Sequence, residues 1–178
     1  GYLKSRVECA MAFCAAEGAE IEDIDVFIDE YLKRCQDPGS VPYFLRGFYI
    51  SYAQIKSLRL DILSEASADL TTAFGELDDA LEMLKAASVG PIFESYYSLI
   101  LSHRLRLGNN LERSRQELRR AEDLVDDVFI PTVSVGLMIE RSRHSEAKGR
   151  MDAVDVSLQQ AMMICLDSGW RNRVRYLT

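Results

Sequence analysis

The stretch Leu118-Arg119-Arg120-Ala121, with Pro131 thirteen residues after Leu118, decides the fold because it recurs along the chain. The copies are Leu77-Asp78-Asp79-Ala80 with Pro91, Leu158-Gln159-Gln160-Ala161, and a looser Ile28-Asp29-Glu30-Tyr31 with Pro42. The leading residues lie 49, 41 and 40 positions apart, and the prolines 49 and 40. Two markers that shift together at this period indicate stacked helical hairpins.

The repeat predicts an all-α protein, a right-handed superhelix of about four antiparallel helical hairpins and a truncated fifth. Its hairpins are expected at 2–35, 42–87, 91–128 and 131–167, with 170–178 starting the next, in one domain cut from a larger protein. The expected helices are 2–16, 21–35, 42–63, 69–87, 91–107, 111–128, 131–148 and 151–167. Val128 to Ile139 is rich in β-branched residues and could be misread as a strand, but Pro131 occupies the repeated proline position.

Glycines and prolines punctuate this pattern. Pro42, Pro91 and Pro131 are each expected in the first turn of a helix, where the missing N–H costs nothing. Gly18, Gly149 and Gly169 are expected to end helices. The second unit is longer than the others, and its extra residues must lie between Leu58 and Thr72 as a longer helix or a longer loop.

Small residues recur where the two helices of a hairpin would cross. They let helix axes approach toward the low end of the range of about 8–10 Å. These residues are Ala80, Ala121 and Ala161 on second helices, and Ala53, Ser102 and Ser142 on first helices. Larger apolar residues, including Phe44, Phe93, Leu77 and Leu118, are expected to fill the core around them.

This order of small residue, loop glycine, large-x-x-Ala and proline resembles the tetratricopeptide (TPR) repeat. On that resemblance, Ser102 takes the small first-helix position, Leu118 the large second-helix position and Ala121 the alanine. The period of 40–41 is longer than the 34 residues of the family. Long units of this kind, with Ala147 to Val154 and Leu158 to Trp170 as they stand here, resemble the sensor region of the large LuxR-family regulators of the maltose-regulator type.

The resemblance covers most of residues 90–178 and implies a sensor domain of a bacterial transcriptional regulator. In that family an ATPase module precedes the repeats and a DNA-binding helix-turn-helix follows them. This sequence contains neither a Gly-x-x-x-x-Gly-Lys-[Ser/Thr] motif nor a basic recognition helix. The alternative is a TPR-type protein-interaction adaptor with no small-molecule effector.

Composition excludes several classes of function. The net charge is −7, with −8 in residues 1–89 and +1 in residues 90–178, so direct nucleic-acid contact is not expected. No run approaches the roughly 18 apolar residues of a membrane span, and residues 1–4 show no signal-peptide pattern, so we expect a cytoplasmic protein without membrane contact. The four cysteines form no Cys-x-x-Cys pair and are expected to be reduced and mostly buried.

The sequence offers no catalytic constellation, and we expect neither enzyme activity nor a metal or cofactor. His103 and His144 lie 41 residues apart and are expected to be partly exposed surface histidines. Acidic pairs such as Asp78-Asp79 are expected on a solvated face. Tyr97 is expected in the core, because it aligns with Phe48 and Leu137, whereas Tyr96 aligns with glycines.

The candidate binding site is the concave face built by the first helices. Its residues are expected to be Gln54, Tyr96, His103, Arg106 and Arg143. A tyrosine ring beside guanidinium donors suits a polar or anionic effector, such as a sugar derivative, or the carboxylate of a protein segment. The alternative is that they are ordinary exposed polar residues. The apolar stripe Trp170, Val174 and Leu177 further predicts self-association through the C-terminal edge.

Overall fold

The computed structural model describes residues 2–17, 20–66, 68–126, 130–170 and 174, and every regular element among them is an α-helix. The predicted all-α class is therefore confirmed for these residues. The helices are α1 (Tyr2–Ala16), α2 (Ile24–Arg34), α3 (Tyr43–Glu65), α4 (Thr71–Ala87), α5 (Pro91–Leu107), α6 (Leu111–Asp123), α7 (Pro131–Glu146) and α8 (Met151–Asp167). No helix in this described part is long and apolar enough to cross a membrane.

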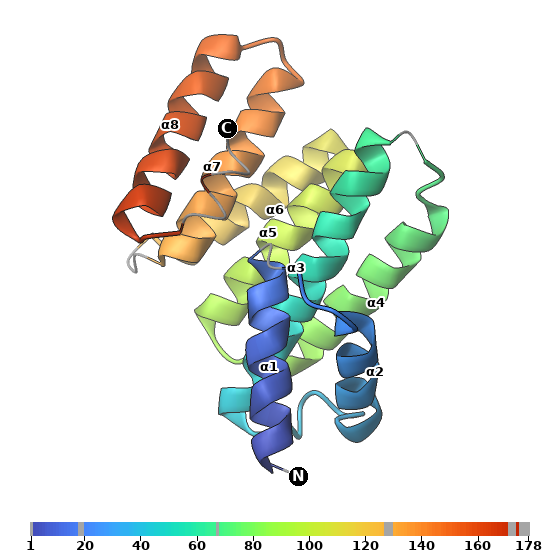
Figure 1. The fold of residues 1–178 in the computed structure, drawn as a ribbon. Coiled ribbons are helices and arrows are strands. Elements are labelled where there is room, and N and C mark those ends of the chain that lie inside the picture. Colours follow the sequence, from blue (N-terminus) through green and yellow to red (C-terminus); the bar gives the residue numbers. More distant parts are fainter. Residues whose placement is uncertain (1, 18–19, 67, 127–129, 171–173, 175–178) are drawn as a thin grey trace.

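Consecutive helices pair as hairpins, and the odd-numbered helices also pack against one another. α1 lies against α3, α3 against α5, and α5 against α7 (Figure 1). Each even-numbered helix packs against its own odd-numbered partner, and α4 and α6 also contact the odd-numbered helix that follows. The row α1, α3, α5, α7 therefore forms one continuous side of the stack, which is where the sequence places its candidate site.

Several helices begin or end at the prolines and glycines that were expected at their boundaries. Pro91 and Pro131 are the first residues of α5 and α7, as predicted, whereas Pro42 precedes the first residue of α3. α3 has 23 residues against 17 in α5, so the extra length of the second hairpin is largely helix. Gly149 and Gly169 follow α7 and α8 with φ of 68° and 70°, where glycine avoids the cost of a Cβ. Gly18 lies outside the described residues.

Two predicted boundaries are wrong by more than two residues. α2 begins at Ile24 instead of residue 21, and residues 22–23 form a turn. α6 ends at Asp123 instead of continuing to 128, and residues 124–126 form a turn. Acidic side chains at 122, 123 and 126 oppose the negative end of the helix dipole, which disfavours further helix there. Residues 127–129 lie outside the described part, and Pro131 to Ile139 belong to α7, so the described portion of Val128 to Ile139 holds no strand.

The predicted small residues occupy the crossings. Ala53, Ala80, Ala121, Ala161 and Ser102 are fully buried, and Ser142 is nearly so. Ser102 Oγ donates to the carbonyl of Ser114 at 2.8 Å, and Ser114 Oγ donates back to the carbonyl of Ser102 at 2.7 Å. These reciprocal bonds join α5 to α6 directly and fix the register of that hairpin.

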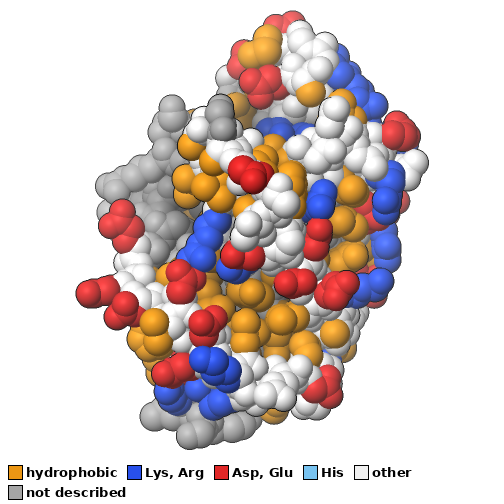
Figure 2. Space-filling model, turned by 90° about the vertical axis from the view of Figure 1, so that its right-hand side faces the viewer, with side chains coloured by type: hydrophobic (Ala, Val, Ile, Leu, Met, Phe, Trp, Pro, Cys, Tyr) orange, Lys and Arg blue, Asp and Glu red, His pale blue; other side chains and the backbone are white. Residues whose placement is uncertain are grey.

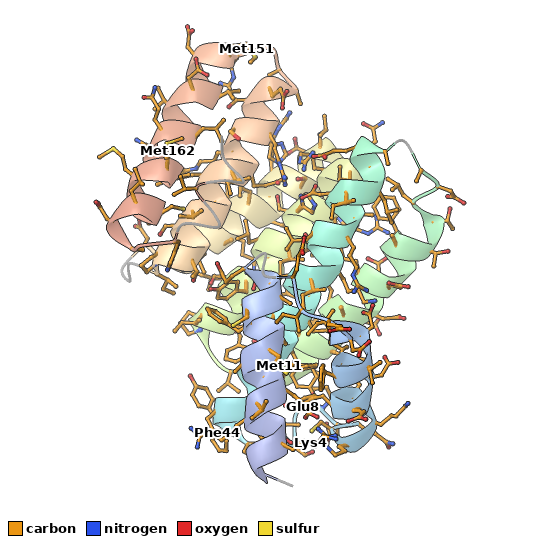
Figure 3. All side chains as sticks on the ribbon, in the orientation of Figure 1. Lys4, Glu8, Met11, Phe44, Met151 and Met162 are labelled. Carbon is orange, nitrogen blue, oxygen red and sulfur yellow. The ribbon has the colours of Figure 1, made fainter. Side chains whose placement is uncertain are left out.

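Phe44 is the exception among the predicted core residues. Phe44 is 54% exposed and lies in the first turn of α3 (Figure 3). Leu45, Phe48 and Tyr49 are buried instead, so the core-facing side of α3 is offset from the column aligned with Phe93.

Aromatic residues join α2 to α3, and an ion pair with a buried carboxylate joins α1 to α2. The Tyr31 ring stacks on Phe48 with centroids 3.7 Å apart, and Tyr31 Oη donates to the carbonyl of Leu45 at 3.0 Å. Burial raises the pKa of the Tyr31 hydroxyl, which keeps it a donor. Glu8, labelled in Figure 3, is buried on α1 and accepts from Arg34 of α2. A carboxylate buried this deeply needs such a partner.

The remaining expectations concern surfaces and thiols. Acidic and basic side chains surround a group of hydrophobic ones on the face in Figure 2, so that face presents no uniform basic surface. Cys165 is buried and Cys9 and Cys35 are half-buried, but Cys14 is exposed, contrary to the expectation of mostly buried thiols. All four are free. Trp170 and Val174 pack against a small cluster around Cys165. Leu177 lies outside the described residues, and self-association through this edge stays a prediction.

Candidate functional site

A cavity of about 190 Å³ opens along the row of odd-numbered helices. Its walls come from the end of α1 and from α3, α5 and α7, so each hairpin contributes its first helix. One part of the wall is apolar: Ala16, Leu58, Leu99, Ile100, Gly136 and Ile139. The other is polar or charged: Glu17, Gln54, Ser57, Asp61, His103, Thr132, Glu140 and Arg143.

A buried histidine lies at the centre of the charged part. His103 of α5 is 5% exposed and sits between carboxylates from the two neighbouring helices. Its Nε2 lies 3.2 Å from Asp61 Oδ1 of α3, and its Nδ1 lies 3.3 Å from Glu140 Oε2 of α7. One imidazole ring thus bridges three helices that are not consecutive in the chain.

Two arginines complete this cluster. Arg143 Nη2 donates to Asp61 Oδ2 at 3.0 Å, and Arg106 Nε donates to Glu140 Oε1 at 2.7 Å. The Nη1 atom of Arg143 and the Nη2 atom of Arg106 lie 2.9 Å and 3.0 Å from His103 Nδ1. We call Asp61, His103, Arg106, Glu140 and Arg143 the bridging cluster.

The charges within the bridging cluster shift the titration of its members. Burial alone would raise the pKa of Glu140, but the partners His103 and Arg106 lower it to about 2. For Asp61, His103 and Arg143 likewise overcome burial and lower the pKa. Burial opposes charge on His103, yet Asp61 and Glu140 raise its pKa. Both carboxylates are therefore ionised at neutral pH and hold the arginines in place.

The structure brings most of the predicted site residues together. Gln54, His103 and Arg143 line the cavity. Arg106 lies beside it and reaches His103 and Glu140. Tyr96 does not line the cavity: its hydroxyl hydrogen-bonds with Thr132, which does.

Three expectations about these side chains are wrong. His103 and His144 are each 5% exposed, not surface histidines, because α5 and α7 are covered by neighbouring helices where these rings lie. Tyr96 is buried and Tyr97 half-buried, the reverse of the predicted order. Both arginines are paired with carboxylates inside the protein, whereas the sequence suggested open donors for an anion.

The second histidine belongs to the packing between α6 and α7. Ser114 Oγ lies 2.8 Å from His144 Nε2, and both residues are buried. Burial lowers the pKa of His144, which favours the neutral ring. A serine and a histidine at this distance resemble part of a nucleophilic pair, but neither lines the cavity.

Sequence reasoning missed Asp61, Glu140 and Gly136. A signal existed for the two carboxylates: Asp61 lies seven residues after Gln54, and Glu140 three before Arg143, so each shares a helix face with a predicted site residue. Both were overlooked because acidic side chains were assigned to solvated faces. Nothing in the sequence could show that Gly136 allows α7 to approach Leu99 closely.

The arrangement suits binding. It offers an apolar wall, a few convergent polar groups and charges held rigidly by their partners, which is the usual composition of a small-molecule site. Among the described residues, no three His, Cys, Asp or Glu side chains form a group that could hold a metal ion.

Comparison of the chain with protein-family models, with curated proteins and with solved structures found no match.

Proposed function

We propose that this chain is a non-catalytic binding scaffold, the sensor domain of a bacterial transcriptional regulator in the cytoplasm, and that a small-molecule effector binds in the cavity. One observation carries the proposal: four hairpins each contribute their first helix to one cavity, and three of them are joined there by the bridging cluster. A ligand in this position touches every unit of the stack.

The proposed architecture is a right-handed TPR-like superhelix. It is supported by the buried alanines and serines at the crossings and by the row of odd-numbered helices. The regulator assignment rests on the sequence resemblance over residues 90–178.

Binding in the cavity provides a route to regulation. The spacing of α3, α5 and α7 is coupled to the curvature of the helical stack. A ligand that prefers one spacing shifts the population of protein molecules toward the curvature that has this spacing. The ligand can shift this balance only by the difference between its affinities for the two curvatures. In a regulator, this change of curvature would reach the modules that flank the repeats.

The test begins with a library of small polar metabolites, screened by thermal shift and confirmed by calorimetry. Arg143→Ala and Arg106→Ala should change the affinity of a confirmed ligand by about tenfold, since each removes one partner of a buried charge. Arg119→Ala, on the exposed side of α6, should leave the affinity unchanged. If all three substitutions change the affinity equally, the ligand does not bind in the cavity. If peptides bind and no small molecule does, the protein-interaction adaptor is favoured over the sensor domain.

A further inference from the structure

The charged groups around the cavity balance one another. Among the described residues, the lining carries three carboxylates, those of Glu17, Asp61 and Glu140. Arg143 of the lining and Arg106 beside it provide two positive charges. Burial opposes charge on His103, but Asp61 and Glu140 raise its pKa, so the ring provides a third positive charge at pH 6. Three positive groups therefore face three negative ones, and the site has no excess of either sign.

Each of these charges already has a partner inside the protein. Arg143 Nη2 donates to Asp61 at 3.0 Å, and Arg106 Nε donates to Glu140 at 2.7 Å. His103 lies 3.2 Å from Asp61 and 3.3 Å from Glu140. Glu17 also interacts with another residue. A charged ligand of either sign could gain a counter-ion here only by breaking one of these pairs, which would leave a group such as the buried Glu140 without its partner.

The volume and the apolar wall of the cavity suit a small ring. A cavity of about 150 Å³ is large enough for benzene in another protein, so about 190 Å³ admits a six-membered ring with one short substituent. Apolar contact for such a ring comes from α3, α5 and α7, through Leu58, Leu99, Ile100 and Ile139. These contacts favour the ring whatever the charge of its substituent.

Two uncharged polar side chains of the lining can bind the substituent. Gln54 and Ser57 precede Asp61 on α3 by seven and four residues, so all three share the side of the helix that borders the cavity. Both are half-buried, and neither side chain forms a hydrogen bond with another of the described residues. An amide and a hydroxyl can each donate and accept. A neutral polar group of a ligand can therefore be hydrogen-bonded here without disturbing an ion pair.

We propose that the cavity binds a small uncharged molecule, a six-membered ring with one hydroxyl or amide group, and that the polar group lies at Gln54 and Ser57 of α3. This inference rests on the proposed function and gives its effector a chemical class. It keeps the polar ligand that the sequence suggested and sets aside the anionic one. The bridging cluster then fixes the spacing of α3, α5 and α7 around the ligand and does not bind a ligand charge.

Three probes with the same ring test the charge preference. Benzyl alcohol, benzylamine and benzoate carry a neutral, a positive and a negative substituent. Each is titrated at pH 6 into the full 178-residue chain, and the affinities are measured from amide chemical shifts. Benzyl alcohol should bind at least about tenfold more tightly than either ion, because an ion loses hydration in the cavity and finds no unpaired counter-ion there.

Matched variants locate the hydroxyl and the ring. Gln54→Leu removes the amide and keeps a side chain of similar size, so it should weaken the binding of benzyl alcohol severalfold and should not weaken that of toluene, which has no polar group. Gln159→Leu makes the same change at an exposed position of α8 outside the cavity lining and should alter neither affinity. Ile139→Trp fills the cavity and should abolish the binding of every probe. Circular dichroism checks that each variant keeps its helices.

The possible outcomes separate this inference from the proposed function. If benzylamine or benzoate binds most tightly and Ile139→Trp abolishes that binding, the uncharged class is wrong and a small-molecule cavity remains. If Gln54→Leu and Gln159→Leu change the affinity for benzyl alcohol equally, the position given to the polar group is wrong. If no probe binds at millimolar concentration but the metabolite library yields a ligand that depends on Arg143, only the class is wrong. If neither the probes nor the library bind, the small-molecule sensor is wrong as well.

Discussion

Gly136 of α7 lies directly against Leu99 of α5, so close that a Cβ on Gly136 would come within 2.5 Å of Leu99 Cδ2. Both residues line the cavity. Gly136→Ala should therefore force Leu99 to move. Overpacking costs about 1–3 kcal/mol, and the better helix propensity of alanine returns about 1 kcal/mol. We expect a net loss of up to about 2 kcal/mol, measured by urea unfolding.

Gly47 of α3 is the matched control for this prediction. It aligns with Gly136 in the repeat, but beyond its own chain neighbours and the nearby backbone of α3 no described atom lies within 4 Å of the position of its Cβ. Gly47→Ala should raise the free energy of unfolding by up to about 1 kcal/mol. If both substitutions stabilise the protein equally, the close approach of α5 and α7 is not a constraint on the fold.

Ala121 tests the helix crossing within the third hairpin. Its side chain is fully buried between α5 and α6, so Ala121→Leu should overpack the crossing and cost about 1–3 kcal/mol. Arg119→Leu places the same side chain on the exposed side of α6 and should stay within about 0.5 kcal/mol of the wild type. An unchanged melting temperature for Ala121→Leu would contradict a close crossing there.

His103 should make stability depend on pH above its ordinary pKa. The folded protein raises the pKa of this ring above 6.5, so it holds the proton more tightly than the unfolded chain does. The resulting stabilisation is complete below pH 6.5 and is lost as the pH rises through the raised folded value. The melting temperature of the wild type should therefore fall toward that of His103→Gln between pH 6 and 9. If the difference in melting temperature between the wild type and His103→Gln grows as the pH rises across this range, folding lowers the pKa of His103 and does not raise it.

Glu140 is expected to be the most sensitive member of the bridging cluster. Glu140→Gln removes the charge that faces His103 and Arg106 in a buried position, so we expect a loss of about 3 kcal/mol in the free energy of unfolding. Because the pKa of Glu140 is lowered to about 2, its contribution is present above pH 4.5 and is lost as the pH falls toward that value. Glu146→Gln, exposed on the same helix, should change stability by less than about 0.5 kcal/mol. Equal losses would contradict the role of the cluster.

The sequence predicted the helices and their order because local signals specify both. Pro91 and Pro131 begin helices for a reason that depends only on the missing N–H, and Ala121 is buried because only a small side chain fits a close crossing. The repeat also placed Gln54, His103 and Arg143 on one side of the stack. That result needs only the alignment of equivalent positions in successive hairpins.

The sequence could not specify how those side chains pair. Whether Arg143 faces solvent or Asp61 depends on the curvature of the stack, which no repeat period encodes. The burial of His103 likewise depends on how closely α3 and α7 flank α5. Phe44 was misplaced for a related reason: the unit with the longest helix is offset relative to the columns that the other units share.

The hydrogen bond between Arg143 and Asp61 joins residues that are 82 positions apart in the sequence. Asp61 belongs to the second hairpin and Arg143 to the fourth, so the bond connects two units that are not consecutive. In a simple repeat stack each unit contacts only its neighbours, so unfolding can begin at an end and proceed unit by unit. Here the second and fourth hairpins are joined to each other, and neither can open without breaking a partly buried ion pair. The helices α3 to α7 should therefore exchange their amide hydrogens as one cooperative block, whereas α2 should open separately at a lower free energy.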